Sequence, residues 1–145
     1  MPIAPGGPTA GRVAVDTSAL LALANPRDQY HSQAVATARR FLEGGGRWIG
    51  TPLVLAELHT HLLHRRGSNA ARTVLGALLT DSAYQWIEVG AGLIRDAAAR
   101  WLERFPDQRF SLTDAVSFEV MRREKLTAAF AYDRDFETAG FELLK

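Results

Sequence analysis

Short apolar segments alternate with longer amphipathic segments along most of this sequence, and this alternation constrains the fold more than any other feature. We predict strands, from their length and their apolar and aromatic content, at residues 12–16, 47–50, 85–89 and 127–132, with a final edge strand at 141–144. The helices predicted between them span about 17–25, 29–43, 52–66, 68–80, 91–104 and 111–125. Strands that alternate with helices predict an α/β fold, here a three-layer sandwich around a mostly parallel sheet.

Several helix boundaries have a clear local signal. The three glycines at 44–46 are expected to end the helix before them. Thr51 followed by Pro52 predicts a helix start, with the threonine hydroxyl as N-cap and proline at the first helical position. Gly67 is expected to end that helix, and Ser68 is expected to cap the next one.

Composition places the chain among globular proteins. The 145 residues suffice for one domain, which we assign to residues 12–145, after a flexible lead-in rich in Pro and Gly at residues 1–11. Cysteine is absent, so disulfides and thiolate metal sites are excluded, and a reducing cytoplasm is the expected location. The formal net charge of +1 leaves any nucleic-acid surface to local patches, and no apolar run is long enough to span a membrane.

Four acids occupy positions that the predicted fold brings together. Asp16 ends the first strand and Asp133 follows the strand at 127–132, so both should emerge at the carboxyl edge of the sheet. Asp114 lies in the first turn of a helix, and Glu57 lies inside another. Clustered carboxylates repel one another, and a divalent cation removes that repulsion. Oxygen ligands without cysteine favour Mg²⁺ or Mn²⁺, which can activate water for phosphodiester hydrolysis.

The segments that carry these acids resemble the PIN-domain family of metal-dependent ribonucleases. They are, in order, AVDTSALL, LAELHTHL, SLTDAVSFEVM and TAAFAYDRDF. The resemblance extends over nearly all of the chain, and the length and order of acids are most similar to the VapC-type toxins of toxin–antitoxin pairs. It implies that the family's catalytic and metal-binding acids correspond to Asp16, Glu57, Asp114 and Asp133. Asp135 is an alternative or additional ligand, and Thr17 and Ser18 match the hydroxyl residues that support the first acid.

The resemblance also implies an activity and partners. The activity is metal-dependent cleavage of RNA, which leaves a 5′-phosphate and a 3′-hydroxyl. The partners are a cognate antitoxin that blocks the site and a second copy of the chain in a homodimer. Two other functions stay open: an RNA-processing nuclease that is not a toxin, and a PIN-fold module that binds RNA or protein without catalysis.

Each acid taken alone has an ordinary structural explanation. Asp16 can cap the helix that follows it, and Asp114 has the spacing of a capping box with Ser111 and favours the helix dipole. Glu57 lies on a polar helix face, which in most proteins is simply solvated. The occurrence of all four acids in series therefore carries the prediction. A haloacid-type phosphatase is disfavoured because Ser18 stands where such an enzyme needs a second aspartate.

Histidines and arginines offer further candidates. Glu57, His61 and His64 share a helix face that could bind a transition metal, but the spacing is not HExxH, and solvation or contact with RNA phosphate is favoured. The arginines that we select as candidates for binding RNA phosphates lie in the same third of the chain as Asp114 and Asp133: Arg122, Arg123 and Arg134.

Overall fold

The computed structural model describes residues 11–144 and contains one parallel sheet. Its strands are β1 (Arg12–Val15), β2 (Arg47–Gly50), β3 (Tyr84–Trp86), β4 (Ala128–Phe130) and β5 (Glu142–Leu143). Their order is β3-β2-β1-β4-β5, and every neighbouring pair is parallel. The predicted fold class and edge strand are confirmed, although β3 and β4 are shorter than predicted. Apart from Gly11, the predicted lead-in lies outside the described residues.

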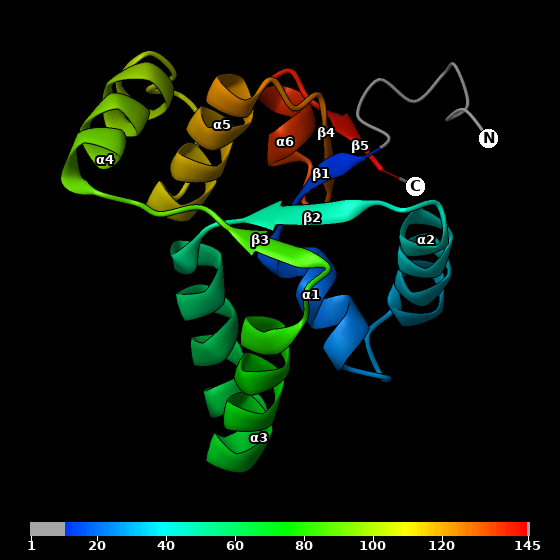
Figure 1. The fold of residues 1–145 in the computed structure, drawn as a ribbon. Coiled ribbons are helices and arrows are strands. Elements are labelled where there is room, and N and C mark those ends of the chain that lie inside the picture. The colour runs from blue at the N-terminus through cyan, green and yellow to red at the C-terminus, as the bar shows by residue number, and fades with distance from the viewer. Residues whose placement is uncertain (1–10, 145) are drawn as a thin grey trace.

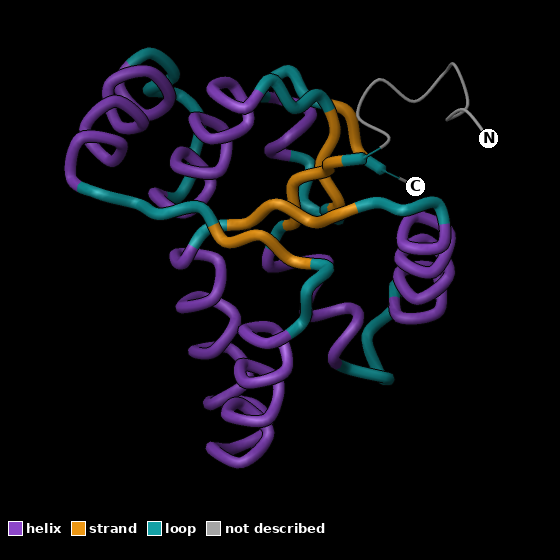
Figure 2. The backbone as a smooth tube through the Cα atoms, viewed as in Figure 1, coloured by secondary structure: helices purple, strands orange, loops and turns teal. Residues whose placement is uncertain are grey.

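Helices cover both faces of this sheet (Figures 1 and 2). They are α1 (Thr17–Ala24), α2 (His31–Glu43), α3 (Pro52–Thr80), α4 (Ala91–Ala97), the π-helical η1 (Ala98–Glu103), α5 (Leu112–Glu124) and the short α6 (Asp135–Thr138). One face packs against α1, α2 and α3, and the other packs against α4, η1, α5 and α6. The chain therefore forms the predicted three-layer sandwich.

The alternation of side chains along the strands explains why two helical layers are needed. In β1, Val13 and Val15 belong to the hydrophobic cluster beneath α1 and α3, whereas Ala14 between them belongs to the cluster beneath α5. In β2, Trp48 and Ile49 divide in the same way. Successive residues of a strand point to opposite faces, so a strand that is apolar throughout must be covered on both sides.

The long helix α3 contains a break at Gly67. The backbone of Gly67 has φ 88° and ψ 172°, a conformation that is essentially restricted to glycine, so two helical segments meet there. The predicted division of this region into two helices is confirmed. Gly44 likewise caps the end of α2, as the glycines at 44–46 predicted. No helix within residues 11–144 has the length and apolar character needed to cross a membrane.

Two local features differ from the sequence-based expectation. Thr51 occupies the N-cap position of α3, but its hydroxyl makes no capping hydrogen bond. The Thr51 hydroxyl is instead buried, and it has no hydrogen-bond partner among the described residues. The predicted helix over 91–104 is present, but its second half, η1, is wound as a π-helix.

The strand order places a topological switch point between β1 and β4. The chain goes from β1 outward to β2 and β3, and then crosses to the other side of β1 to form β4 and β5. The backbone N–H of Asp16 donates to the Phe130 carbonyl at 3.0 Å, which extends the pairing to the carboxyl ends of these two strands. In open α/β sheets, ligands bind at such a point.

Candidate metal centre

Asp16 lies directly after β1 and is 3% exposed. Its Oδ2 accepts hydrogen bonds from the Ser18 hydroxyl at 2.6 Å and from the Ser18 backbone N–H at 3.2 Å, so Asp16 caps α1. The Ser18 hydroxyl in turn accepts a hydrogen bond from the Tyr132 N–H at 2.9 Å. One serine therefore connects the ends of β1 and β4 and fixes the Asp16 carboxylate through its Oδ2.

Asp114 is held at the start of α5 by a capping box. The Asp114 N–H donates to the Ser111 hydroxyl at 3.0 Å, and the Ser111 N–H donates to Asp114 Oδ2 at 3.3 Å. The capping role that the sequence indicated for Asp114 is therefore confirmed. The Asp114 side chain is also buried, with 7% of its surface exposed. Because the cap uses one carboxylate oxygen, the same side chain can still offer the other to a ligand.

Asp133 lies in the turn that follows β4, and Asp135 is the first residue of α6. The Asp135 N–H donates to Asp133 Oδ1 at 2.9 Å, which closes this turn. Asp114, Asp133 and Asp135 each offer one carboxylate oxygen, and these three oxygens lie within 4.8 Å of one another. Both acids of the DRDF segment thus face Asp114.

All five candidate acids line one pocket of about 380 Å³. Its lining comes from the ends of β1 and β4, from α1 and α3, and from the start of α5: Asp16, Thr17, Ser18, Leu21, Glu57, His61, Arg109, Ser111, Asp114, Asp133 and Asp135. We call it the acidic pocket. Glu57 reaches it from α3 and is partly exposed, but Glu57 and Asp16 stand outside the close cluster of three carboxylates.

The pKa values of three acids in the pocket are raised by burial and by the neighbouring carboxylates. Burial raises the pKa of Asp16 to about 6, and the charge of Asp133 adds to the shift against the opposing hydrogen bonds from Ser18. Burial, followed by the charges of Asp16 and Asp133, raises the pKa of Asp114 to about 7. The pKa of Asp135 is also raised, by burial and then by Asp133. The ionised pocket is therefore unstable by itself, and a cation would relieve it.

The donor set fits a hard divalent cation. Carboxylates are the side-chain ligands that Mg²⁺ and Mn²⁺ prefer, and three of them converge within coordination reach. Thr17 also lines the pocket, and its buried Oγ1 has no hydrogen-bond partner within residues 11–144. Buried hydroxyls normally have a partner, so this one indicates an additional polar species in the pocket.

Two residues that were not predicted as catalytic or metal-binding residues also line the acidic pocket. Arg109 lines it but was not among the sequence candidates. The only signal in the sequence was its place two residues before the capping serine of α5. His61, which the sequence offered as a solvated or phosphate-binding residue, also lines this pocket. Among the described residues, the cluster of metal-ligating side chains contains no histidine.

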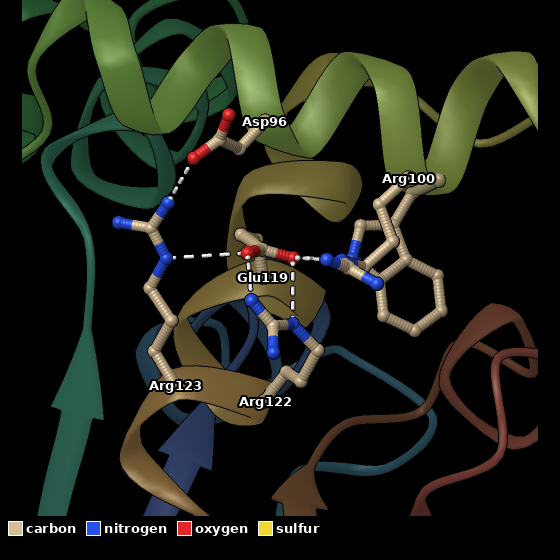
Figure 3. A network of polar contacts seen from close by, with 6 residues as sticks. Asp96, Arg100, Glu119, Arg122 and Arg123 are labelled. Atoms are coloured by element: carbon tan, nitrogen blue, oxygen red, sulfur yellow. Dashed lines mark hydrogen bonds and ion pairs between the residues drawn. The ribbon is translucent and has the colours of Figure 1, made fainter.

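Arg122 and Arg123 lie away from the acidic pocket, in a network around Glu119 (Figure 3). Glu119 is fully buried, and Arg122 donates to it through Nε at 3.2 Å and a terminal nitrogen at 2.8 Å. Arg123 donates to Glu119 at 3.2 Å and to Asp96 at 2.5 Å. Both arginines are thus held by acids of the protein itself, and their role in RNA binding stays a prediction.

The network continues into η1. Arg100 Nε lies 3.1 Å from Glu119 Oε1, and the Trp101 indole N–H donates to the same oxygen at 3.1 Å. Burial alone would raise the pKa of Glu119, but the hydrogen bonds from Arg122, Trp101 and Arg123 outweigh it and lower this pKa to about 2. The third arginine candidate, Arg134, is 92% exposed and lies 3.8 Å from Glu137.

Comparison with known proteins identifies the family to which this chain is similar. The family model described as the PIN domain matches residues 13–142. VapC20 of Mycobacterium tuberculosis, a 23S rRNA-specific endonuclease, is 35% identical over 134 residues, which cover 88% of this chain and 93% of VapC20. Its crystal structure, described as a Sarcin-Ricin loop cleaving toxin, matches with a TM-score of 0.78 and 33% identity over 89% of this chain and 95% of that one.

A more distant structure shares the fold alone. VapBC2 from Rickettsia felis, solved bound to a DNA fragment from its promoter, matches with a TM-score of 0.65 at 13% identity and covers 91% of this chain and 96% of that one. The family model, the M. tuberculosis relative and its structure confirm the resemblance seen in the sequence. The chain belongs to the PIN-domain family.

Proposed function

We propose that this protein is a metal-dependent endoribonuclease and the toxin of a toxin–antitoxin pair. The observation that carries the proposal is the convergence of acids from four separate parts of the chain in one pocket at the switch point of the sheet. The identity to VapC20, a 23S rRNA-specific endonuclease, supports the same activity.

The metal would be held by Asp114, Asp133 and Asp135, whose carboxylate oxygens already lie within 4.8 Å of one another. Asp16 completes the set from the end of β1, and Glu57 faces the same space from α3. When bound, Mg²⁺ or Mn²⁺ would neutralise the carboxylates, lower the pKa of water and stabilise the charge that develops on phosphorus. Asp133 and Asp135 therefore act together in this proposal.

The surrounding residues have separate roles. Ser18 orients the Asp16 carboxylate through the 2.6 Å hydrogen bond, and Ser111 orients Asp114 through the capping box. The Thr17 hydroxyl, unpartnered among the described residues, would hydrogen-bond to water or to a phosphate oxygen. Arg109 would bind a phosphate of the substrate, since a guanidinium matches phosphate in shape and charge.

The substrate and partners follow by analogy with the relatives. The proposed substrate is RNA, with ribosomal RNA as the first candidate because VapC20 is named for cleavage of 23S rRNA. The proposed partners are an antitoxin that covers the acidic pocket and a second copy of this chain. The cytoplasmic location expected from the cysteine-free sequence stays a prediction.

The test is cleavage of ribosomal RNA by the purified protein with Mn²⁺, with excess EDTA, and with the Asp114→Asn variant. We expect cleavage that requires both the metal and Asp114, and products that carry a 5′-phosphate. Calorimetry with Mn²⁺ on the same samples measures whether the site binds metal. Metal binding without cleavage of any RNA would favour a PIN-fold binding module, and absence of metal binding would refute the proposed centre.

A further inference from the structure

A second pocket, of about 480 Å³, adjoins the acidic pocket. Leu21 of α1 and His61 of α3 line both pockets, so the two are neighbouring parts of one groove between these helices. We call the second part the basic pocket because three of its four charged lining residues are arginines: Arg27, Asp28, Arg65 and Arg66.

One face of α3 forms a wall of both pockets and changes charge along its length. Glu57, His61 and Arg65 are spaced by four residues, so they lie in a row on the same side of the helix. Glu57 faces the acidic pocket, His61 faces both pockets and Arg65 faces the basic pocket. The groove therefore runs from a metal-binding end to a cationic end along a single helix.

The opposite wall is the turn that follows α1. The Asn25 side chain accepts a hydrogen bond from the Arg27 N–H at 3.0 Å, which fixes the backbone that carries this arginine. Asp28 is engaged with its own turn, because its carboxylate accepts a hydrogen bond from the Tyr30 N–H at 2.8 Å. Arg66 joins the two walls by donating to the Ala24 carbonyl at 2.7 Å.

Arg27 and Arg65 are the cations of this pocket that are available to a ligand. Both side chains are exposed, and neither forms an ion pair with another residue in the range 11–144. This distinguishes them from Arg122 and Arg123, whose guanidinium groups are bound to Glu119. Two arginines without an acidic partner, on facing walls of a groove, are suited to a phosphate group.

We propose that the basic pocket binds a backbone phosphate of the RNA strand whose scissile bond lies in the acidic pocket. This inference rests on the proposed nuclease function and identifies how the substrate is held. A strand that carries one negative charge per nucleotide needs cations beside a site made of carboxylates, and the groove supplies them at one end. Eight residues of helix separate Glu57 from Arg65, about 12 Å, which accommodates a few nucleotides.

The test measures RNA binding apart from cleavage. A short fluorescent oligouridylate is titrated with the Asp16→Asn protein, which suppresses cleavage, in the presence of Mg²⁺ and over a range of salt concentrations. The same titration is made after adding Arg27→Gln and Arg65→Gln together. We expect about a tenfold loss of affinity, and a log–log salt slope that falls by about 0.7 for each phosphate contact removed.

Matched controls come from the same fold. Arg72→Gln removes one exposed arginine of α3 that lies outside both pockets, and it should leave the affinity and the salt slope unchanged. Arg66 is left intact because its guanidinium supports the Ala24 carbonyl. Charge reversal by Arg65→Glu should weaken binding more than Arg65→Gln does. Thermal unfolding of each variant checks the fold, and Mn²⁺ calorimetry on the arginine variants made with Asp16 intact checks that the acidic pocket is unaffected.

The outcomes separate this inference from the nuclease proposal. If the protein with wild-type acids cleaves RNA with Mn²⁺ but the double arginine variant binds oligouridylate with the same affinity and salt slope, the basic pocket is not a phosphate site. If that variant binds RNA normally but loses binding to polyglutamate, the pocket recognises an acidic peptide and the inference is wrong. Failure of the nuclease proposal shows separately, as absence of cleavage or of Mn²⁺ binding in the protein with all arginines present.

Discussion

The Ser18 hydroxyl donates a 2.6 Å hydrogen bond to Oδ2 of Asp16. The same oxygen of Ser18 accepts the Tyr132 N–H at 2.9 Å, so its proton is directed toward the carboxylate. This arrangement stabilises the ionised form of Asp16, because hydrogen bonds from Ser18 oppose the rise in its pKa caused by burial. Ser18 is therefore a positioning residue for the candidate metal ligand.

Replacing Ser18 by alanine should weaken metal binding and cleavage together. The substitution removes a hydrogen bond to a charged group, worth about 1.5–3 kcal/mol, and raises the pKa of Asp16 further. We expect a lower Mn²⁺ affinity by calorimetry, and a cleavage-versus-pH profile shifted to higher pH. Ser18→Thr, which keeps the hydroxyl, should restore much of both. The exposed Ser32→Ala is the control, and equal behaviour of the two alanine variants would exclude the positioning role.

Stability of the metal-free protein should fall as pH rises. The pKa values of Asp16 and Asp114 in the folded protein are raised to about 6 and about 7, above their ordinary value of 3.8. Both groups therefore favour the folded state below their unfolded pKa, and this contribution is lost as pH rises through about 6 to 7. Asp114→Asn should increase the free energy of unfolding of the metal-free protein at about pH 8, by on the order of 2–3 kcal/mol, and by less at about pH 5, where Asp114 is ionised in the unfolded chain but the difference between the two states is not yet complete. Urea unfolding at the two pH values measures the difference.

Mn²⁺ should reverse this pH dependence. The cation binds the ionised carboxylates, so its affinity and its stabilising effect should be larger at about pH 8 than at about pH 5. Thermal unfolding with and without Mn²⁺ at the two pH values measures the difference. A stabilisation by Mn²⁺ that is the same at both pH values, or that persists in Asp114→Asn, would place the cation elsewhere.

The fold was predictable because the patterns that specify it are local. Apolar runs, glycines and the Thr51–Pro52 pair placed every strand and main helix within a few residues. The π-helical winding of η1 was not predictable, since AARWLE has an ordinary helical composition. The unpaired hydroxyl of Thr51 was not predictable either, because capping geometry depends on backbone details that residue type does not set.

The candidate site was predictable only in part, for a similar reason. Asp16 and Asp133 were identified because they follow strands whose carboxyl ends must meet in a parallel sheet. Arg109 was missed because its loop has no periodicity to place the side chain. The partners of Arg122 were missed although Glu119 is three residues away, because burial of Glu119 depends on packing against the distant Trp101.

The Glu119 network should stabilise the protein through a buried charge. Replacing both Arg122 and Arg123 by glutamine leaves the buried carboxylate of Glu119 with only Arg100 and the Trp101 indole N–H beside it, and we expect a lower free energy of unfolding. Adding Glu119→Gln to that double variant should recover part of the loss, because the buried charge is then absent. Urea unfolding measures these free energies, and the exposed Arg95→Gln is the control. A triple variant less stable than the double variant would contradict this account.

Lowering the pH should reduce the contribution of Glu119 to the free energy of unfolding. The pKa of Glu119 is lowered to about 2, below its ordinary value of 4.5. Its contribution to stability is therefore present above about 4.5 and is lost as pH falls toward 2. The difference in unfolding free energy between the wild-type protein and Glu119→Gln should shrink over this range, which urea unfolding at several acidic pH values can follow. A difference that is constant down to about pH 2 would show that Glu119 acts through packing alone.

Substitution of Gly67 should destabilise the protein, because the break in α3 requires a backbone conformation that glycine adopts easily. Its φ of 88° and ψ of 172° are accessible to glycine and strained for alanine, so Gly67→Ala should destabilise the protein by about 1–3 kcal/mol. Gly76 offers a matched control in the same helix: its φ is not positive, and an added Cβ would meet nothing within 4 Å. Gly76→Ala should therefore stabilise the protein by about 0.5–1 kcal/mol. Urea unfolding compares the two variants, and similar effects of the same sign would mean that the break at Gly67 is not a feature of the folded protein in solution.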